Sequence, residues 1–268
     1  MRNSDTSAQH QITRLQELIQ EAVHIVVLTG AGISAESGIP TFRDAQTGYW
    51  SKFRPEDLAT PEAFRRDPEL VWRWYAERRA AVRAATPNAG HLALSRLEAN
   101  APNFTLITQN VDGLHARAGS KRLIEIHGNI LRVRCFARCV SYPDFDQDNL
   151  KASGSAISPG PQGDLELESS PAPRCPECGD HLRPDVVWFG ENLPEAEIAQ
   201  AFEATEQADL FLSIGTSAVV YPAAMLPQTA IESGATVVEI NPEETPLSTL
   251  LHLSIRGTAA GVLPQVVP

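Results

Sequence analysis

The feature that most constrains this chain is a glycine-rich turn that directly follows a short apolar run. Residues 25–28 are typical of a buried parallel strand, and Gly30-x-Gly32-x-x-Ala35 matches the relaxed dinucleotide fingerprint. Gly30 would permit the tight turn, Gly32 would let the backbone approach a pyrophosphate, and Ala35 would let a helix pack on the strand. The N-terminus of that helix would face the phosphates. The pattern by itself also fits a plain strand-to-helix turn, because Gly-x-Gly turns are common.

The residues after this turn make the pattern more specific. Pro40 ends the helix, so that Phe42 and Arg43 follow on a loop beside the phosphate turn. The block from Thr29 to Asp44 resembles the sirtuin family, the NAD-dependent protein lysine deacylases. The resemblance extends from about residue 23 to residue 259, and several later blocks support it.

Composition limits the classes of function and the partners. The 268 residues suffice for one large domain, or a large and a small one, with a sizeable core. A net charge of −11 argues against a nucleic-acid partner and against an anionic membrane surface. No apolar run approaches the roughly 20 residues of a membrane helix, and the N-terminus has no hydrophobic signal region. We therefore expect a cytoplasmic protein whose cysteines bind metal or stay as thiols. A monomer is expected as well.

Apolar runs alternate with helical patterns along the chain, which predicts a mostly parallel sheet covered on both faces. The expected strands are 25–29, 104–108, 123–126, 210–214, 236–240 and 253–256. The expected helices include 9–23, 70–83, 194–208 and one near 222–234, and residues 1–8 are expected to be disordered. The fold class is α/β: a Rossmann-like part, 9–127 and 188–268, with an inserted zinc-binding module at about 128–187.

The four cysteines form two close pairs, Cys135-x₃-Cys139 and Cys175-x₂-Cys178. Two such pairs can supply the four thiolates of a tetrahedral zinc site, which would be structural because no coordination position stays open. Two disulfides, or unrelated buried thiols, are the alternatives. The sirtuin pattern usually has two residues between the first two cysteines, so this chain departs from it there.

Polar residues follow two of the expected strands, where open α/β sheets bind ligands. His127 follows the third strand; a lone histidine is more often structural, but the resemblance implies that it is the catalytic base toward a ribose hydroxyl. His115 is the rival, although it is expected to begin a helix. The resemblance also implies that Asn110 is catalytic and that Asp112 accepts a hydrogen bond from the nicotinamide carboxamide. Taken singly, Asn110 and Asp112 could be strand-end caps.

The resemblance assigns further residues to NAD, at the phosphates, the ribose rings and the adenine. The whole set is Gly30, Ala31, Gly32, Ala35, Thr41, Phe42, Arg43, Trp50, Gln109, Asn110, Val111, Asp112, Gly215, Thr216, Ser217, Asn241, Glu243 and Ala259. Without the resemblance, the residues after the later strands would be interpreted as helix caps.

Two features point to the acylated substrate. Tyr75-x-x-Arg78, together with a small Ala59, resembles the class III sirtuins, which remove succinyl, malonyl and glutaryl groups; Arg offers a planar fork to a carboxylate, and Tyr adds a donor. Residues 186–191 resemble the family's substrate segment, which would pair with the peptide as an added strand through Val187, Phe189 and Gly190. The alternatives are a surface arginine and an ordinary buried strand.

The sequence therefore predicts an NAD-dependent deacylase for acylated-lysine proteins that releases nicotinamide and O-acyl-ADP-ribose. A deacetylase-preferring sirtuin is one alternative. A hydride-transferring dehydrogenase is another, but no acidic residue ends the next strand as that fingerprint requires, since Glu56 and Asp57 follow no strand. The third alternative is a catalytically inactive, zinc-stabilised module that binds NAD or ADP-ribose. The presence of His127 and Asn110 argues against it.

Overall fold

The chain forms two compact units. The structure is a computed structural model that describes residues 2–40, 52–139, 141–142 and 171–267. Unit 1 comprises Met1–Phe42, Ala85–His127 and Leu193–Pro268, and unit 2 comprises Arg43–Ala84 and Gly128–Asn192. Each unit is therefore built from segments that lie far apart in the sequence.

Unit 1 contains a six-stranded parallel sheet with the order β3-β2-β1-β7-β8-β9. The order runs outward in both directions from the central pair β1–β7, as in doubly wound nucleotide-binding folds. The central strands are mostly apolar, as expected for strands buried on both faces. The strands are β1 (His24–Thr29), β2 (Asn103–Thr108), β3 (Leu123–Glu125), β7 (Leu210–Ile214), β8 (Thr236–Ile240) and β9 (Leu253–Ile255).

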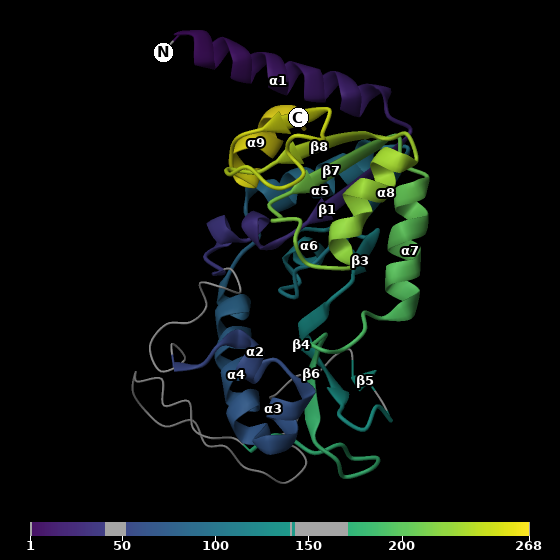
Figure 1. The fold of residues 1–268 in the computed structure, drawn as a ribbon. Helices are drawn as coiled ribbons and strands as arrows, with labels where there is room; N and C mark the ends of the chain where they lie inside the picture. The colour runs from purple at the N-terminus through teal and green to yellow at the C-terminus, as the bar shows by residue number, and fades with distance from the viewer. Residues whose placement is uncertain (1, 41–51, 140, 143–170, 268) are drawn as a thin grey trace. The chain divides into compact units, whose positions relative to one another are not determined.

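Helices cover both faces of this sheet (Figure 1). Alternate residues of a strand point to opposite faces, so Ile25 and Val27 face one core and Val26 and Leu28 face the other. The first core is closed by α1 (Arg2–Glu21), α5 (Ala89–Asn100) and α9 (Ala259–Val266), and the second by α7 (Glu195–Glu206) and α8 (Leu226–Glu232). The predicted α/β class is thus confirmed.

Two helices differ from the sequence prediction. Helix α1 begins at Arg2, where a disordered stretch over residues 1–8 was predicted; no Pro or Gly interrupts those residues. Helix α9 was not predicted, because Gly261 and Pro264 lower its helix propensity, yet it buries Val262 and Leu263.

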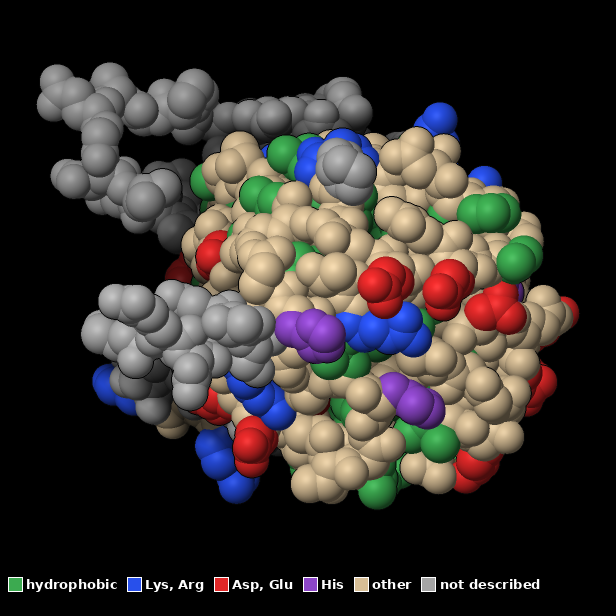
Figure 2. All heavy atoms as spheres, turned by 90° about the horizontal axis from the view of Figure 1, so that it is seen from above, with side chains coloured by type: hydrophobic (Ala, Val, Ile, Leu, Met, Phe, Trp, Pro, Cys, Tyr) green, Lys and Arg blue, Asp and Glu red, His purple; other side chains and the backbone are tan. Residues whose placement is uncertain are grey.

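Figure 2 shows the protein from the side of α1, where basic, acidic and apolar side chains lie interspersed. No described helix has both the length and the hydropathy needed to cross a membrane.

Unit 2 joins three helices to a small antiparallel sheet. The helices are α2 (Pro55–Leu58), α3 (Pro61–Arg66) and α4 (Pro68–Ala84), and the sheet has the order β5-β4-β6, with β4 (Gly128–Cys135), β5 (Ser141–Tyr142) and β6 (Leu182–Val186). Thr60 caps α3 by accepting from the Ala63 N–H, with Pro61 at the first turn, a pattern that favours a helix start. Trp72 of α4 packs on Val133 and Leu182 in the core of this unit.

Candidate active site

The glycine-rich turn after β1 fits against the turn after β7. The Gly30 N–H donates to the Ile214 carbonyl at 3.1 Å, and the Gly32 N–H donates to the Gly215 carbonyl at 2.8 Å. A Cβ added to Gly32 would lie 2.8 Å from the Gly215 Cα, so a side chain there would collide with backbone. These glycines therefore allow two turns to touch at the strand-order switch point, where doubly wound sheets bind their ligands.

The α-helix predicted to follow this turn is absent from the described residues. Two short 3₁₀ helices take its place, η1 (Ala31–Ile33) and η2 (Ala35–Ser37), and Gly38 then adopts a left-handed φ of 79°. Gly38 and Pro40 would end a helix that began at Ala31 after about two turns. The predicted contribution of a helix dipole at the phosphates was therefore wrong, because a three-residue 3₁₀ helix aligns few peptide dipoles.

A buried cluster of polar side chains joins the glycine-rich turn to the segment after β2. The Ser34 hydroxyl donates to Asp112 Oδ2 at 2.7 Å and accepts from Asn110 Nδ2 at 3.0 Å. The other Asp112 oxygen accepts from the Leu114 N–H at 2.9 Å. All three polar side chains are buried. The two blocks that the sequence assigned to NAD therefore meet, and their hydrogen bonds fix the orientation of Asn110 and Asp112.

Two buried histidines lie behind this cluster. The rings of His91 and His115 are 4.8 Å apart, and His115 Nε2 lies 3.0 Å from the Thr29 hydroxyl. Burial lowers the pKa of His91 to about 4, although the negative charge of Asp112 acts to raise it. Burial, and then the neighbouring His91, lowers the pKa of His115 to about 3. Both rings are therefore neutral near pH 7, and His115, which is 1% exposed, is poorly placed to exchange protons with a ligand.

His127 has a different arrangement. Its Nδ1 lies 3.0 Å from the Gln109 carbonyl oxygen. A carbonyl oxygen only accepts, so Nδ1 carries the proton of the neutral ring and Nε2 keeps a free lone pair. Burial lowers the pKa of His127, and the bond to Gln109 offsets part of that effect. A partly buried, neutral imidazole with a fixed tautomer has the properties of a general base.

The segments after β7 and β8 are tied to the same edge of the sheet. Thr216 accepts from Gln109 Nε2 at 2.9 Å through its hydroxyl and from Asn241 Nδ2 at 2.9 Å through its carbonyl. Asn241 therefore belongs to the hydrogen-bonded edge, while the side chain of Glu243 is exposed. Of the other residues predicted to contact NAD here, Ser217 is exposed and Ala259 is buried at the start of α9.

Glu239 of β8 holds the loop that carries Asn241 and Glu243. Its carboxylate is almost fully buried. Burial alone would raise its pKa, but the hydrogen bonds it accepts outweigh that effect and hold the pKa below its usual value. The donors are Ser248, Thr245, Ser254 and Arg256. Arg256 in turn donates to the Glu243 carbonyl at 2.7 Å, so one buried charge fastens most of this loop.

In unit 2, Tyr75 and Arg78 lie on consecutive turns of α4, as their spacing predicts. Tyr75 is buried, and burial raises its pKa to about 12, so the phenol stays protonated at physiological pH. Arg78 is half-buried with its guanidinium 5.0 Å from the Trp74 ring centroid. Burial lowers its pKa, and the nearby Tyr75 opposes this; an arginine still keeps its charge.

The predicted substrate segment follows β6 and turns. The strand ends at Val186, Val187 follows it half-buried, and Phe189 and Gly190 form a turn. The Glu191 N–H donates to the Trp188 carbonyl at 3.0 Å, which closes that turn. The predicted extended backbone therefore stops short of Phe189. The Phe189 N–H donates to the carbonyl of the buried Ala59 at 2.9 Å, while the Phe189 side chain is 46% exposed.

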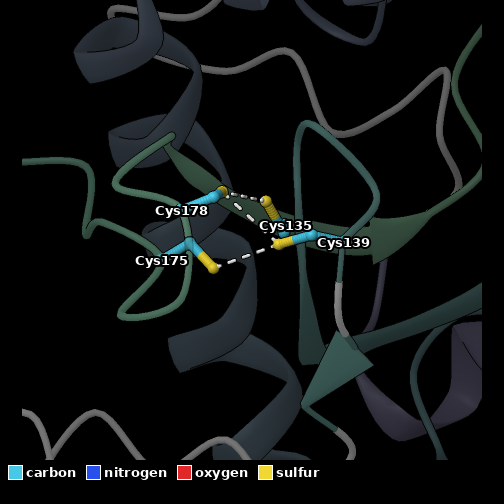
Figure 3. Close-up of side chains that lie close together, drawn as sticks. All are labelled: Cys135, Cys139, Cys175 and Cys178. Carbon is cyan, nitrogen blue, oxygen red and sulfur yellow. Dashed lines mark hydrogen bonds between the residues drawn. The ribbon is translucent and has the colours of Figure 1, made fainter.

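The four cysteines converge at one point (Figure 3). Their Sγ atoms all lie within 4.8 Å of one another, and three pairs are 3.4 Å apart. A tetrahedral zinc with bonds of about 2.3 Å needs sulfurs about 3.8 Å apart, so the thiols fit this ion. The extra residue of the first pair is accommodated at Arg138, whose φ of 59° lets the chain turn back on itself. The departure from the usual spacing therefore leaves the ligand set intact.

Comparisons with known proteins identify the family. The domain model described as the Sir2 family matches residues 30–222. The chain belongs to the Sir2 family, the sirtuins. It is 50% identical over 246 residues to an NAD-dependent protein deacylase of Aquifex aeolicus, covering 92% of this chain and 95% of the relative. A crystal structure of a Sir2 homolog–NAD complex superposes with a TM-score of 0.82 at 44% identity, covering 95% and 92% of the two chains.

A further Sir2 structure contains a deacetylated p53 peptide with 3′-O-acetyl ADP-ribose. It has a TM-score of 0.79 at 35% identity and covers 95% of this chain and 96% of its own. The resemblance to sirtuins drawn from the sequence is thus confirmed. Four residues predicted to contact NAD, Thr41, Phe42, Arg43 and Trp50, lie outside the described residues.

Sequence reasoning missed several supporting side chains in each of the two units. His91 is one, although the Asn88…His91 spacing of a capping box could have indicated its position at the start of α5. Glu239 and Arg256 are others; an acid inside an otherwise apolar strand is a recognisable sign of a buried partner. Arg183 and Glu191, which pair at 2.6 Å, were also missed.

Proposed function

We propose that this Sir2-family protein is an NAD-dependent protein deacylase that prefers succinyl- and malonyl-lysine over acetyl-lysine. The activity named for the curated relatives supports the general reaction. The pairing of Tyr75 with Arg78 on α4 supports the preference. The substrates are proteins that carry these acyl groups on lysine, and we propose a single structural zinc held by the four cysteines.

NAD, when bound, supplies the ribosyl carbon that takes the acyl oxygen, with nicotinamide as the leaving group and O-acyl-ADP-ribose as a product. The residues of unit 1 fit this co-substrate. Asn110 and Asp112 present an amide and a carboxylate with fixed orientations beside the glycine-rich turn. Asn241 and Glu243 offer groups suited to ribose hydroxyls on a loop fastened by Glu239.

In this proposal His127 is the general base. Its Nδ1–H is committed to the Gln109 carbonyl, so Nε2 is the atom that accepts a proton from a ribose hydroxyl. A pKa below the usual histidine value keeps the ring neutral near pH 7. Protonation at Nε2 makes both ring nitrogens donors without disturbing the bond to Gln109. His115 is excluded from this role by its burial and its bond to Thr29.

Arg78 and Tyr75 act on the acyl group. The guanidinium fork of Arg78 forms charge-assisted hydrogen bonds with a terminal carboxylate, and the protonated Tyr75 hydroxyl adds a donor. An acetyl group ends in a methyl and would leave Arg78 without that anion. A site built to bind a polar group discriminates strongly against a substrate that lacks it.

The test is a panel of one peptide that carries acetyl-, malonyl-, succinyl- or glutaryl-lysine. With NAD present, nicotinamide and free lysine peptide are quantified by chromatography, and kcat/KM is compared. We expect malonyl and succinyl to exceed acetyl by about tenfold or more. Equal or better use of the acetyl peptide would refute the preference. Absence of nicotinamide with every peptide would refute the deacylase reaction itself.

A further inference from the structure

Tyr75 has a hydrogen-bond partner that its own helix does not provide. The indole Nε1–H of Trp188 donates to the Tyr75 hydroxyl oxygen at 2.9 Å. Both side chains are buried, Trp188 at 2% and Tyr75 at 4% exposure. A hydrogen bond between neutral groups in such a dry setting fixes the position of the phenol oxygen.

This bond also determines which way the phenol proton points. A tryptophan N–H only donates, so the Tyr75 oxygen is the acceptor. Among the residues that the structure describes, none accepts the Tyr75 proton. Its proton is retained up to a pKa of about 12, so the Tyr75 O–H is available to donate to a ligand. Donation suits a carboxylate and does nothing for a methyl group.

Trp188 is itself held from two sides. The Arg183 guanidinium carbon lies 3.3 Å from the Trp188 ring centroid, and Arg183 makes a bidentate pair with Glu191 at 2.6 and 2.8 Å. The Glu191 carboxylate also accepts from the Trp188 backbone N–H at 2.9 Å and from Arg134 at 3.2 Å. Burial alone would raise the Glu191 pKa, but the hydrogen bonds and charge of Arg183, the Trp188 N–H and the charge of Arg134 together outweigh it and keep the carboxylate ionised.

From this geometry we infer that Trp188 is a positioning residue for acyl specificity. It aims the Tyr75 hydroxyl at the carboxylate of the acyl chain, and the Arg183–Glu191 pair keeps Trp188 in place. The inference rests on the proposed preference for succinyl- and malonyl-lysine, and it extends the specificity determinant from α4 to the segment after β6. Trp188 touches no reacting atom in this account.

The decisive variant is Trp188→Phe, which keeps an aromatic ring and removes the N–H donor. Losing one neutral hydrogen bond corresponds to about a two- to tenfold effect. We expect the succinyl-to-acetyl ratio of kcat/KM to fall by that factor through KM for the succinyl peptide, while KM for NAD stays the same. Trp72→Phe is the control, because it removes an indole from the same unit and leaves the Trp188–Tyr75 bond in place.

A double-mutant cycle separates positioning from general packing. In a Tyr75→Phe background, Trp188→Phe should no longer change the succinyl-to-acetyl ratio. A ratio that falls equally in both backgrounds, or acetyl and succinyl activities that fall together, would overturn the inference. If the wild-type protein shows no preference for acidic acyl groups in the peptide panel, the proposed acyl preference itself is wrong. That result is obtained without any variant, so it is distinguished from a failure of the inference about Trp188.

Two further measurements keep the inference open to refutation if Trp188→Phe folds poorly. In NMR spectra recorded without NAD, the indole N–H resonance of Trp188, assigned in the wild-type protein, should shift in Tyr75→Phe. An unshifted resonance would overturn the inference. Glu191→Gln should also lower the succinyl-to-acetyl ratio of kcat/KM, because it weakens the ion pair that holds Arg183 over Trp188. An unchanged ratio would contradict a role of this ion pair in positioning Trp188.

Discussion

Replacing Arg78 by methionine separates substrate recognition from catalysis. The Arg78 guanidinium lies over the Trp74 ring at 5.0 Å, and a methionine of similar length can keep an apolar contact there. The change therefore removes a charge with little loss of packing. A charge-assisted hydrogen bond contributes about 1.5–3 kcal/mol, which corresponds to about a ten- to hundredfold effect.

We expect Arg78→Met to lower kcat/KM for the succinyl peptide by about ten- to hundredfold, and to leave the acetyl peptide and KM for NAD nearly unchanged. The assay follows nicotinamide release with the two peptides side by side. Arg83→Met is the matched control, because Arg83 is exposed in the last turn of the same helix. If Arg78→Met reduces both activities by the same factor, Arg78 is structural and the proposed acyl preference is wrong.

Three further predictions concern the metal, the base and a buried charge. Metal analysis of fresh protein should find one zinc per chain, and Cys175→Ser should reduce both zinc content and soluble, folded protein, because structural zinc contributes folding energy; less than half an equivalent in wild type would contradict this. His127→Ala should abolish nicotinamide release with every peptide while the melting temperature holds, and retained turnover within about tenfold would assign the base elsewhere. Glu239→Gln should raise KM for NAD and lower the free energy of unfolding at pH 7 by about 1–3 kcal/mol. The pKa of Glu239 in the folded protein lies below its ordinary value of 4.5, so this stability is present above pH 4.5 and is lost as the pH falls. In denaturant titrations, the free energies of unfolding of wild type and Glu239→Gln should therefore converge at acidic pH.

The sheet could be predicted from the sequence because its signals are local. Four apolar residues before Gly30 mark a strand with two buried faces, and Thr60-Pro61 marks a capped helix start. Segments with mixed signals were harder. Strand β4 reads Gly-Asn-Ile-Leu-Arg-Val-Arg-Cys, with a register shift between Asn129 and Val133, so its alternation of apolar residues is broken.

The family's site blocks could be located from the sequence, but their supporting contacts could not. The bond from Trp188 to Tyr75 spans 113 positions, and that from Asn110 to Ser34 spans 76. No local pattern encodes such a pairing, because it depends on how distant elements come together. The C-x₃-C pair illustrates the same limit, since only the conformation of Arg138 shows how the extra residue is accommodated.

The contact between the turns after β1 and β7 has a consequence for the order in which the protein assembles. These adjacent strands are joined at their start by the Asp209 carboxylate, which accepts from the Val23 N–H across 186 residues of chain. A chain emerging from the ribosome therefore presents β1 with an unpaired edge until β7 has been made. The glycine-rich turn can reach its final shape only after that late pairing, so we expect this edge of the sheet to form late in folding.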